Sequence, residues 1–233
     1  MVDVHSHILP ALDDGSKNME ESLEMLRIAC DEGIRTMIAT PHNMPGKGCP
    51  DREKVEKRLS DLRTAAAAAG IDIEILLGTE YYYRSDILEE FEEGRVITMN
   101  DTRYVLIEFD PGVNRTYAKN AVREIMALDY RPVIAHVERY PALMERKAEA
   151  VKELRTMGAL IQVNAGSVIG NIGFKVKQSV KYLLQNGLVD LIGSDAHSSR
   201  HRAPRMKECA KYLRKKYNED YCEHLLNAAA LYE

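Results

Sequence analysis

Short apolar runs alternate with longer amphipathic stretches along nearly the whole chain, and this alternation constrains the fold more than any other feature. The seven runs, rich in Val, Ile and Leu, read VDVH, RTMIAT, IEILLGTE, YVLIEF, PVIAHV, ALIQVN and VDLIGSD. Such a pattern predicts repeated βα units rather than a helical bundle or a β-sandwich. The expected strand ends lie near His5, Thr40, Glu80, Glu108, His136, Asn164 and Asp195. From the third end to the sixth the spacing is constant at 28 residues, enough for one strand, one helix and two loops.

The stretches between these runs predict helices, and capping residues mark several helix ends. Asn18 with Glu21 resembles an N-terminal cap before a helix over residues 19–32, and Gly33 ends it. The remaining helices are expected over residues 51–69, 117–129, 145–157, 175–186, 203–216 and 219–231. Residues 43–50 (NMPGKGCP) carry two prolines and two glycines, so we expect a loop there, either a lid or a plain surface connection.

Composition places the chain among ordinary globular proteins and excludes several classes. Its 233 residues are 45% hydrophobic and 29% charged, enough for one sizeable core, so we expect a single domain over residues 1–233. A net charge of -4 gives no general attraction to nucleic acid or to anionic lipid. Four cysteines without a close pair predict neither a zinc knuckle nor a disulfide framework. Because no apolar run reaches membrane length and no signal segment is present, we expect no membrane insertion and a cytoplasmic protein with reduced thiols.

Histidines and acidic residues gather at the expected strand ends, which form the functional rim of an α/β fold. In the motif HSH, His5 and His7 are two residues apart, and alternation along a strand puts such side chains on one face, where both can bind one cation. Asp195 and His197 repeat that spacing at the last strand end. Five of the seven histidines lie at strand ends: His5, His7, His42, His136 and His197.

Shared metal binding by the first and last strand ends would constrain the topology. In an open sheet built in sequence order, the first and seventh strands would lie roughly 29 Å apart, so His5 and Asp195 could not share a metal. Closure into a barrel makes these strands neighbours, and we therefore expect a (β/α)7 barrel, with a doubly wound sheet around a central first strand as the alternative. Glu80 and Glu108 end apolar strands, where a buried carboxylate is costly unless it binds a cation or pairs with an arginine.

Several other chemistries lack their sequence motifs. No cysteine is followed six residues later by arginine, as cysteine-dependent phosphatases require, and the glycine groups match neither the nucleotide P-loop nor the dinucleotide fingerprint. The serine-hydrolase motif G-x-S-x-G is also missing. His224 lies inside a terminal predicted helix and is expected to be structural. Tyr81, Tyr82 and Tyr83 follow Glu80, and we favour a packing role over an aromatic wall of the site.

A series of motifs runs through the chain in a fixed order: DVHSHILPALDDG at residues 3–15, TPH at 40–42, GTE at 78–80, Glu108, HVERY at 136–140 and GSDAH at 193–197. This series resembles the PHP (polymerase and histidinol phosphatase) superfamily, and within it the bacterial metal-dependent protein-tyrosine phosphatases of capsule and exopolysaccharide loci. The resemblance implies a distorted (β/α)7 TIM-like barrel with three divalent metal ions. The implied metal ligands are His5, His7, Asp14, His42, Glu80, Glu108, His136, Asp195 and His197.

Within this set, the resemblance implies one metal on His5, His7, Glu80 and Asp195, with Glu80 bridging to a second metal. The second adds Glu108 and His136, and the third takes Asp14, His42 and His197. Asp13 stands beside Asp14, which leaves the register of that loop open. Phosphate-binding arginines correspond to Arg139 and Arg202, with Arg200 or Arg205 as substitutes for Arg202. The candidate general acid is His201 or a metal-bound water.

The resemblance implies a metal-dependent phosphomonoesterase, and more narrowly a protein-tyrosine phosphatase that acts on a tyrosine kinase of capsule regulation. A hydroxide activated by the metals would attack phosphorus in line. The ligand set contains imidazole and carboxylate but no thiolate, which suits manganese, iron or zinc better than Cu(I), and the resemblance implies manganese among them. The alternative functions are a histidinol-phosphate phosphatase, a metal-dependent nuclease, which the acidic chain disfavours, and a metal-stabilised scaffold that binds a kinase. Sequence alone names neither the natural substrate nor the oligomeric state.

Overall fold

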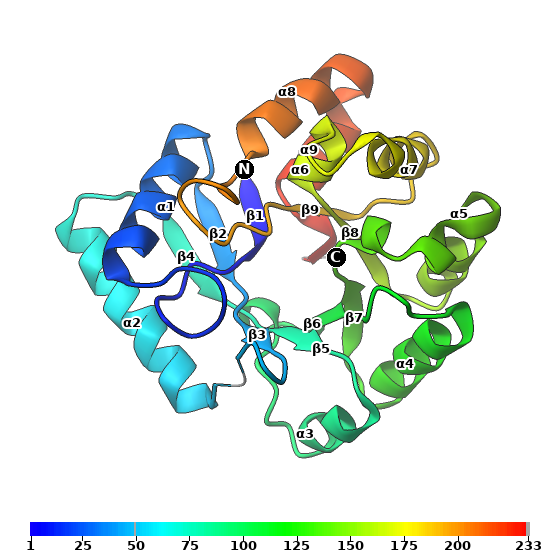
Figure 1. The fold of residues 1–233 in the computed structure, drawn as a ribbon, viewed down its shortest axis with the longest axis horizontal. Helices are drawn as coiled ribbons and strands as arrows, with labels where there is room; N and C mark the ends of the chain where they lie inside the picture. Colours follow the sequence, from blue (N-terminus) through cyan, green and yellow to red (C-terminus); the bar gives the residue numbers. More distant parts are fainter. Residues whose placement is uncertain (49, 232–233) are drawn as a thin grey trace.

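A wall of parallel strands curls around the centre of the molecule, with helices on its outside (Figure 1). The computed structural model describes residues 1–48 and 50–231, so Cys49 and residues 232–233 of the expected domain lie outside the described residues. Three strands pair in the order β1-β2-β4: β1 (Val2–Ser6), β2 (Thr36–Ala39) and β4 (Glu74–Leu77). Six pair in the order β3-β5-β6-β7-β8-β9: β3 (His42–Asn43), β5 (Glu80–Tyr82), β6 (Tyr104–Glu108), β7 (Arg131–Ile134), β8 (Leu160–Asn164) and β9 (Leu191–Gly193).

These strands come from seven βα units, because two expected strands are each broken into two pieces. The run RTMIAT gives β2 and β3, separated by Thr40 and Pro41, and the run IEILLGTE gives β4 and β5, separated by Gly78 and Thr79. Pro41 has no N–H for a strand ladder, which explains one break. A backbone hydrogen bond still joins the two broken strands to each other, because Glu80 N donates to the carbonyl of Pro41 at 3.1 Å. The seven parallel units are confirmed, whereas the expectation of unbroken strands was wrong at these two places.

The first and last strands of the wall are neighbours. Asp195 N donates to the carbonyl of His5, and His7 N donates to the carbonyl of Ala196, both at 2.8 Å. Gly193 permits this close approach, because an added Cβ would lie only 2.6 Å from the Cβ of His5. The distorted (β/α)7 barrel expected from the sequence is therefore confirmed.

Helices surround the strands in the order expected. Their bounds are α1 (Met19–Asp31), α2 (Arg52–Ala68), α3 (Leu88–Glu92), α4 (Arg115–Ala127), α5 (Pro141–Thr156), α6 (Ala165–Ile169), α7 (Phe174–Gln185), α8 (Met206–Lys216) and α9 (Glu219–Leu226). The short helices α3 and α6 were not expected, and α8 starts three residues later than expected. The last helix was expected to reach residue 231, but α9 ends at Leu226. Ala228 has a φ of 53°, which is not helical, and a separate 3-10 turn follows at Ala229–Leu231.

A small apolar cluster occupies the inside of the barrel below the strand ends. It includes Val4, Ile38, Leu106, Val133 and Leu191, one from each of five strands, and such side chains can touch one another only inside the barrel. The much larger cluster lies between the strands and the surrounding helices. Cys30, Cys209 and Cys222 are free thiols, and none of the helices in the described ranges is long and apolar enough to cross a membrane.

Candidate metal centre

All nine residues expected to bind metal converge at the carboxyl ends of the strands. They come from β1 and the loop after it, from β3, β5 and β6, and from the turns after β7 and β9. Most of their side chains are buried, whereas Asp14 is 41% exposed at the mouth. The potential ligand atoms form three groups, and within each group the atoms lie within 4.8 Å of one another. The groups are His7, Asp14, His42 and His197; His5, His7 and Glu80; and His42, Glu80 and Glu108.

Glu80 lies at the middle of this cluster and contacts four histidines. Its Oε2 is 3.1 Å from His5 Nε2 and 3.2 Å from His7 Nε2. The same oxygen is 3.0 Å from His42 Nδ1, while Oε1 is 2.9 Å from His136 Nε2. Both oxygens of one carboxylate thus face different histidines, which is the geometry of a bridging ligand.

Asp14 and Glu108 lie on opposite sides of His42. Asp14 Oδ1 is 3.4 Å from His42 Nε2 and 3.4 Å from His197 Nε2. Glu108 is 3.7 Å from His42 Nδ1 and 3.6 Å from His136 Nε2. Asp195 Oδ1 is 3.7 Å from His5 Nε2, so it shares the inner end of the cluster.

Unpartnered buried atoms show that the donors suit a cation. Side-chain atoms without a hydrogen-bond partner include both ring nitrogens of His42, Nε2 of His197, and one oxygen each of Glu80 and Glu108. Buried polar atoms are almost always hydrogen-bonded, so five unpartnered atoms converging on one place are unusual. A divalent cation of intermediate softness accepts imidazole and carboxylate ligands together. The residues present therefore fit a metal centre.

Asp13 was not predicted as part of the site, and it resolves the register of the first loop. Its Oδ2 accepts from His7 Nδ1 at 2.7 Å and from the backbone N–H of His42 at 2.9 Å, while Oδ1 accepts from Gly15 N at 2.9 Å. Asp13 thus faces away from the cluster and Asp14 faces into it. With Nδ1 donating to Asp13, His7 Nε2 faces Glu80 and is the ring nitrogen left to bind a cation when the ring is neutral.

Two site residues of β8, Gln162 and Asn164, were also not predicted from the sequence. Their alternate positions in the run ALIQVN put both polar side chains on one face of the strand, and this pattern could have revealed them. Gln162 Oε1 lies 3.3 Å from His5 Nδ1 and accepts from His136 N at 2.7 Å. Gln162 Nε2 donates to Asn164 Oδ1 at 2.9 Å, and Asn164 Nδ2 donates to Asp195 Oδ2 at 2.8 Å. This chain of hydrogen bonds orients candidate ligands that follow three strands. Residues that hydrogen-bond to metal ligands without binding the metal themselves commonly have this role.

Backbone strain accompanies two of the predicted ligands. His136 has a φ of 32° and Asp195 a φ of 54°, both in the left-handed region that residues with a side chain rarely adopt. Each follows the end of a strand, so the conformation turns its side chain from the strand toward the cluster.

The pKa values of the two neighbouring glutamates of the cluster, Glu80 and Glu108, shift in opposite directions. Burial raises the pKa of Glu108, and the nearby charge of Glu80 raises it further. Burial opposes ionisation of Glu80 as well, but contacts with His5, His136 and His42 hold its pKa well below the usual range. Burial and the positive charge of His7 lower the pKa of His197 to about 4, which keeps its imidazole neutral and able to bind a cation.

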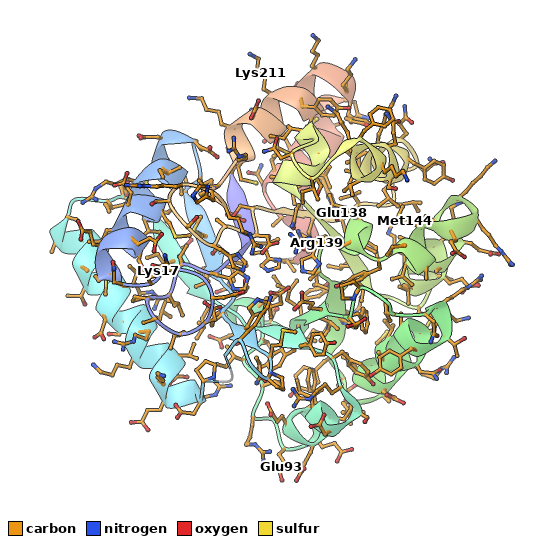
Figure 2. The ribbon with its side chains drawn as sticks, in the orientation of Figure 1. Lys17, Glu93, Glu138, Arg139, Met144 and Lys211 are labelled. Atoms are coloured by element: carbon orange, nitrogen blue, oxygen red, sulfur yellow. The ribbon has the colours of Figure 1, made fainter. Side chains whose placement is uncertain are left out.

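The predicted phosphate-binding residues line a cavity of about 300 Å³ beside the cluster. Arg139 Nη2 donates to Asp195 Oδ2 at 2.6 Å, and Arg202 Nη2 lies 2.9 Å from the same oxygen. Figure 2 shows Arg139 near the middle of the barrel. His201 and Arg205 line this cavity too, whereas Arg200 is not among its lining residues.

Other residues singled out in the sequence lie apart from the cluster. Tyr81 and Tyr83 are buried and pack against Phe91 and Phe109 respectively, which confirms a packing role for these two tyrosines. His224 lies within α9, outside the three groups. The loop at residues 43–48 forms a small antiparallel bridge between Met44 and Gly48.

A parallel α/β barrel with a centre of histidines and carboxylates at its strand ends is the arrangement expected of PHP-type metal-dependent phosphatases. Residues 1–232 match the family described as capsular polysaccharide synthesis, CpsB/CapC. The tyrosine-protein phosphatase CpsB of Streptococcus pneumoniae is 35% identical over 230 residues, which cover 97% of this chain and 94% of that protein. The chain therefore belongs to the CpsB/CapC family.

Solved structures agree with this assignment. A structure reported with YwqE from Bacillus subtilis and CpsB from Streptococcus pneumoniae, described as unique metal-dependent tyrosine phosphatases, superposes with a TM-score of 0.92 at 32% identity, over 99% of this chain and 94% of that chain. Histidinol phosphate phosphatase from Lactococcus lactis gives a TM-score of 0.55 at 12% identity, covering 93% of this chain and 94% of that chain, which is a likeness of fold alone.

Proposed function

We propose that the protein is a metal-dependent protein-tyrosine phosphatase with three divalent cations in its centre. The observation that carries this proposal is the convergence of nine histidine and carboxylate side chains, several with unpartnered buried atoms, beside a cavity lined by three arginines. The names of its relatives support the choice of tyrosine phosphate among phosphate esters.

The contacts support three sets of ligands that share Glu80. The first set surrounds the inner end of the cluster and consists of His5, His7, Glu80 and Asp195. The second consists of Glu80, Glu108 and His136, and the third of Asp14, His42 and His197. The set has imidazole and carboxylate but no thiolate, which suits manganese, iron or zinc. Manganese is the proposed metal because of the resemblance to PHP-type phosphatases, with iron and zinc as alternatives.

Bound divalent cations supply Lewis acidity, which brings the pKa of a water toward neutrality and offsets charge on phosphoryl oxygens. Glu80 holds the ligand sets together, because its two oxygens face histidines from different strands. Asp13 and Gln162 keep the rings of His7 and His5 in the tautomers whose Nε2 atoms face the cluster.

Arg139 and Arg202 are proposed to bind the phosphoryl group of the substrate. Both guanidinium groups contact Asp195 Oδ2, so they lie close together in the cavity. A dianionic phosphate ester offers further oxygens, and planar guanidinium groups bind them with paired hydrogen bonds. The two arginines thereby orient the ester and stabilise charge that grows on phosphorus-bound oxygens.

His201 is the proposed proton donor to the leaving group. It is exposed at the cavity wall, where an incoming aryl oxygen would lie within reach. A tyrosine phenol has a pKa near 10, so the departing oxygen needs less proton donation than an alkyl oxygen would. His201 would then assist the reaction rather than control it.

The biological setting is proposed from the family. A bacterial tyrosine kinase that regulates capsule or exopolysaccharide synthesis is the proposed phosphotyrosine protein, and the cytoplasm is the proposed location. We also propose that residues 1–233 form one domain, because one large apolar cluster extends from Ile8 to Leu226.

The test compares three substrates with protein of measured metal content. A phosphotyrosine peptide, histidinol phosphate and a phosphodiester are incubated with manganese-loaded protein, with and without EDTA. The proposal expects the fastest hydrolysis for the peptide and loss of activity in EDTA. Faster turnover of histidinol phosphate, or full activity in protein shown to contain no metal, refutes it.

A further inference from the structure

The cavity beside the metal centre is lined by charged side chains and by one large apolar side chain. Arg139 and Arg202 both contact Asp195 there. Ile172 also lines the cavity, and Phe174 lies two residues further along the chain, at the start of α7. These two are the most exposed large hydrophobic side chains of the described residues, at 47% and 75%.

Single exposed apolar side chains are normal on proteins, but this pair is held in a fixed position. Asn171 N donates to the carbonyl of Gly166 at 2.9 Å, and Gly173 N donates to the carbonyl of Gly170 at 3.1 Å. Gly170 and Gly173 have φ values of 98° and 112°, which only glycine adopts readily. These backbone hydrogen bonds therefore fix the positions from which the Ile172 and Phe174 side chains extend.

Cavity size and charge indicate what fits. A volume of about 300 Å³ is at the lower end for small-molecule pockets, so the cavity takes one side chain while the rest of a polypeptide stays outside. Its lining contains three arginines and a single carboxylate, Asp195, which already contacts two of those arginines. An aryl phosphate complements this lining, with the dianion on the arginines and the ring against Ile172.

We infer that Ile172 and Phe174 form a docking surface for the phosphotyrosine segment of a polypeptide substrate. Ile172 packs against the aryl ring, and Phe174 packs against an apolar side chain next to the phosphotyrosine. The inference rests on the proposed function and deepens it, because it names the residues that favour a protein substrate over a small phosphate ester.

The experiment uses manganese-loaded full-length protein and two phosphotyrosine peptides. One peptide has leucine on both sides of the phosphotyrosine and the other has glycine there. For the wild type we expect a lower KM with the leucine peptide. In Phe174→Ser the KM for that peptide rises about fivefold or more, because half-burying an aromatic ring contributes on that scale, and the preference over glycine disappears.

Two further measurements separate docking from general damage. Ile172→Ser is expected to raise KM for both peptides and for phenyl phosphate, while inhibition by inorganic phosphate stays unchanged in both variants. Tyr117→Ser is the matched control, because Tyr117 is 43% exposed but belongs to α4 and does not line the cavity. It is expected to leave KM for both peptides unchanged, with melting temperatures measured for every variant.

The outcomes distinguish the inference from the function on which it rests. If the wild type hydrolyses both peptides and Phe174→Ser retains the leucine preference, the docking surface is wrong and the phosphatase proposal stands. Weaker inhibition by inorganic phosphate in step with KM also overturns the docking surface, because the variants would then have disturbed the phosphate site. If metal-loaded wild type does not hydrolyse phosphotyrosine peptides, both proposals fail together.

Discussion

Asp13→Asn is the sharpest test of how the metal centre is built. Asp13 is not a proposed ligand, yet its carboxylate accepts hydrogen bonds from the His7 ring and from two backbone N–H groups. An asparagine of the same shape retains an oxygen for Gly15 N, but it cannot present acceptors to all of these donors. The tautomer that points His7 Nε2 at Glu80 is therefore no longer enforced.

The magnitude follows from the bond that is lost. A hydrogen bond to a charged group contributes about 1.5–3 kcal/mol, and outer residues around metal sites typically change metal affinity or activity by about 10- to 100-fold. We expect Asp13→Asn to lose about that much manganese affinity and to regain part of its activity at high manganese concentration. Calorimetric metal titration and turnover of phenyl phosphate on the same samples measure both effects.

Asp110→Asn provides the matched control. Asp110 also accepts the backbone N–H of the glycine two residues later, Gly112, at 2.7 Å, but it contacts none of the histidines of the cluster. We expect this variant to keep metal affinity and turnover within about twofold of wild type, as usual for surface substitutions. If Asp13→Asn behaves like Asp110→Asn, His7 does not need its carboxylate partner and the reasoning is wrong.

Three further predictions concern the centre and its support. Glu80→Gln should lose about tenfold more activity than Glu108→Gln. The reason is that Glu80 contacts four histidines within 3.2 Å, whereas Glu108 contacts two at 3.6 Å or more. Equal metal content and equal turnover in the two variants would contradict this prediction. Alanine at Arg139 or Arg202 should cost roughly 10- to 150-fold in turnover per metal-loaded molecule, with lysine restoring only part, and unchanged turnover in both alanine variants removes these arginines from the mechanism. Gly193→Ala should lower the melting temperature and the metal content together, because its Cβ would lie 2.6 Å from a side-chain atom of β1; a wild-type melting curve would show that the barrel accommodates it.

Local rules were enough to predict the strand ends and the residues on them. An apolar run ending in Glu80 or Glu108 is a pattern of neighbouring residues, and neighbouring residues decide strand and helix propensity. The sequence favoured a closed barrel once His5 and Asp195 were expected to share a cation, and the hydrogen bonds between the first and last strands decide it against a doubly wound sheet. The structure brings the nine side chains to one place.

Contacts between segments that are distant in the sequence could not be predicted from these local rules. The strand break at Gly78 depends on how β4 meets its neighbours, because an added Cβ at Gly78 would lie 3.3 Å from side-chain atoms of Ile38 and Thr40. The exposure of Phe174 depends on the turn that carries it and on the absence of a covering segment among the described residues. Neither property is encoded by the residue types within a short window.

The amino-acid sequence by itself determined the repeated βα units and the histidines and carboxylates at their functional end, because hydrophobic periodicity and residue chemistry are local properties. Only the tertiary structure decided which of Asp13 and Asp14 faces the cluster, since both lie in one loop and differ only in what that loop packs against. It likewise decided that Gln162 of β8 orients His5, from 157 residues away along the chain. Side chains so distant in sequence become partners only through closure of the barrel, which sets the distances that hydrogen bonds and metal ligands require.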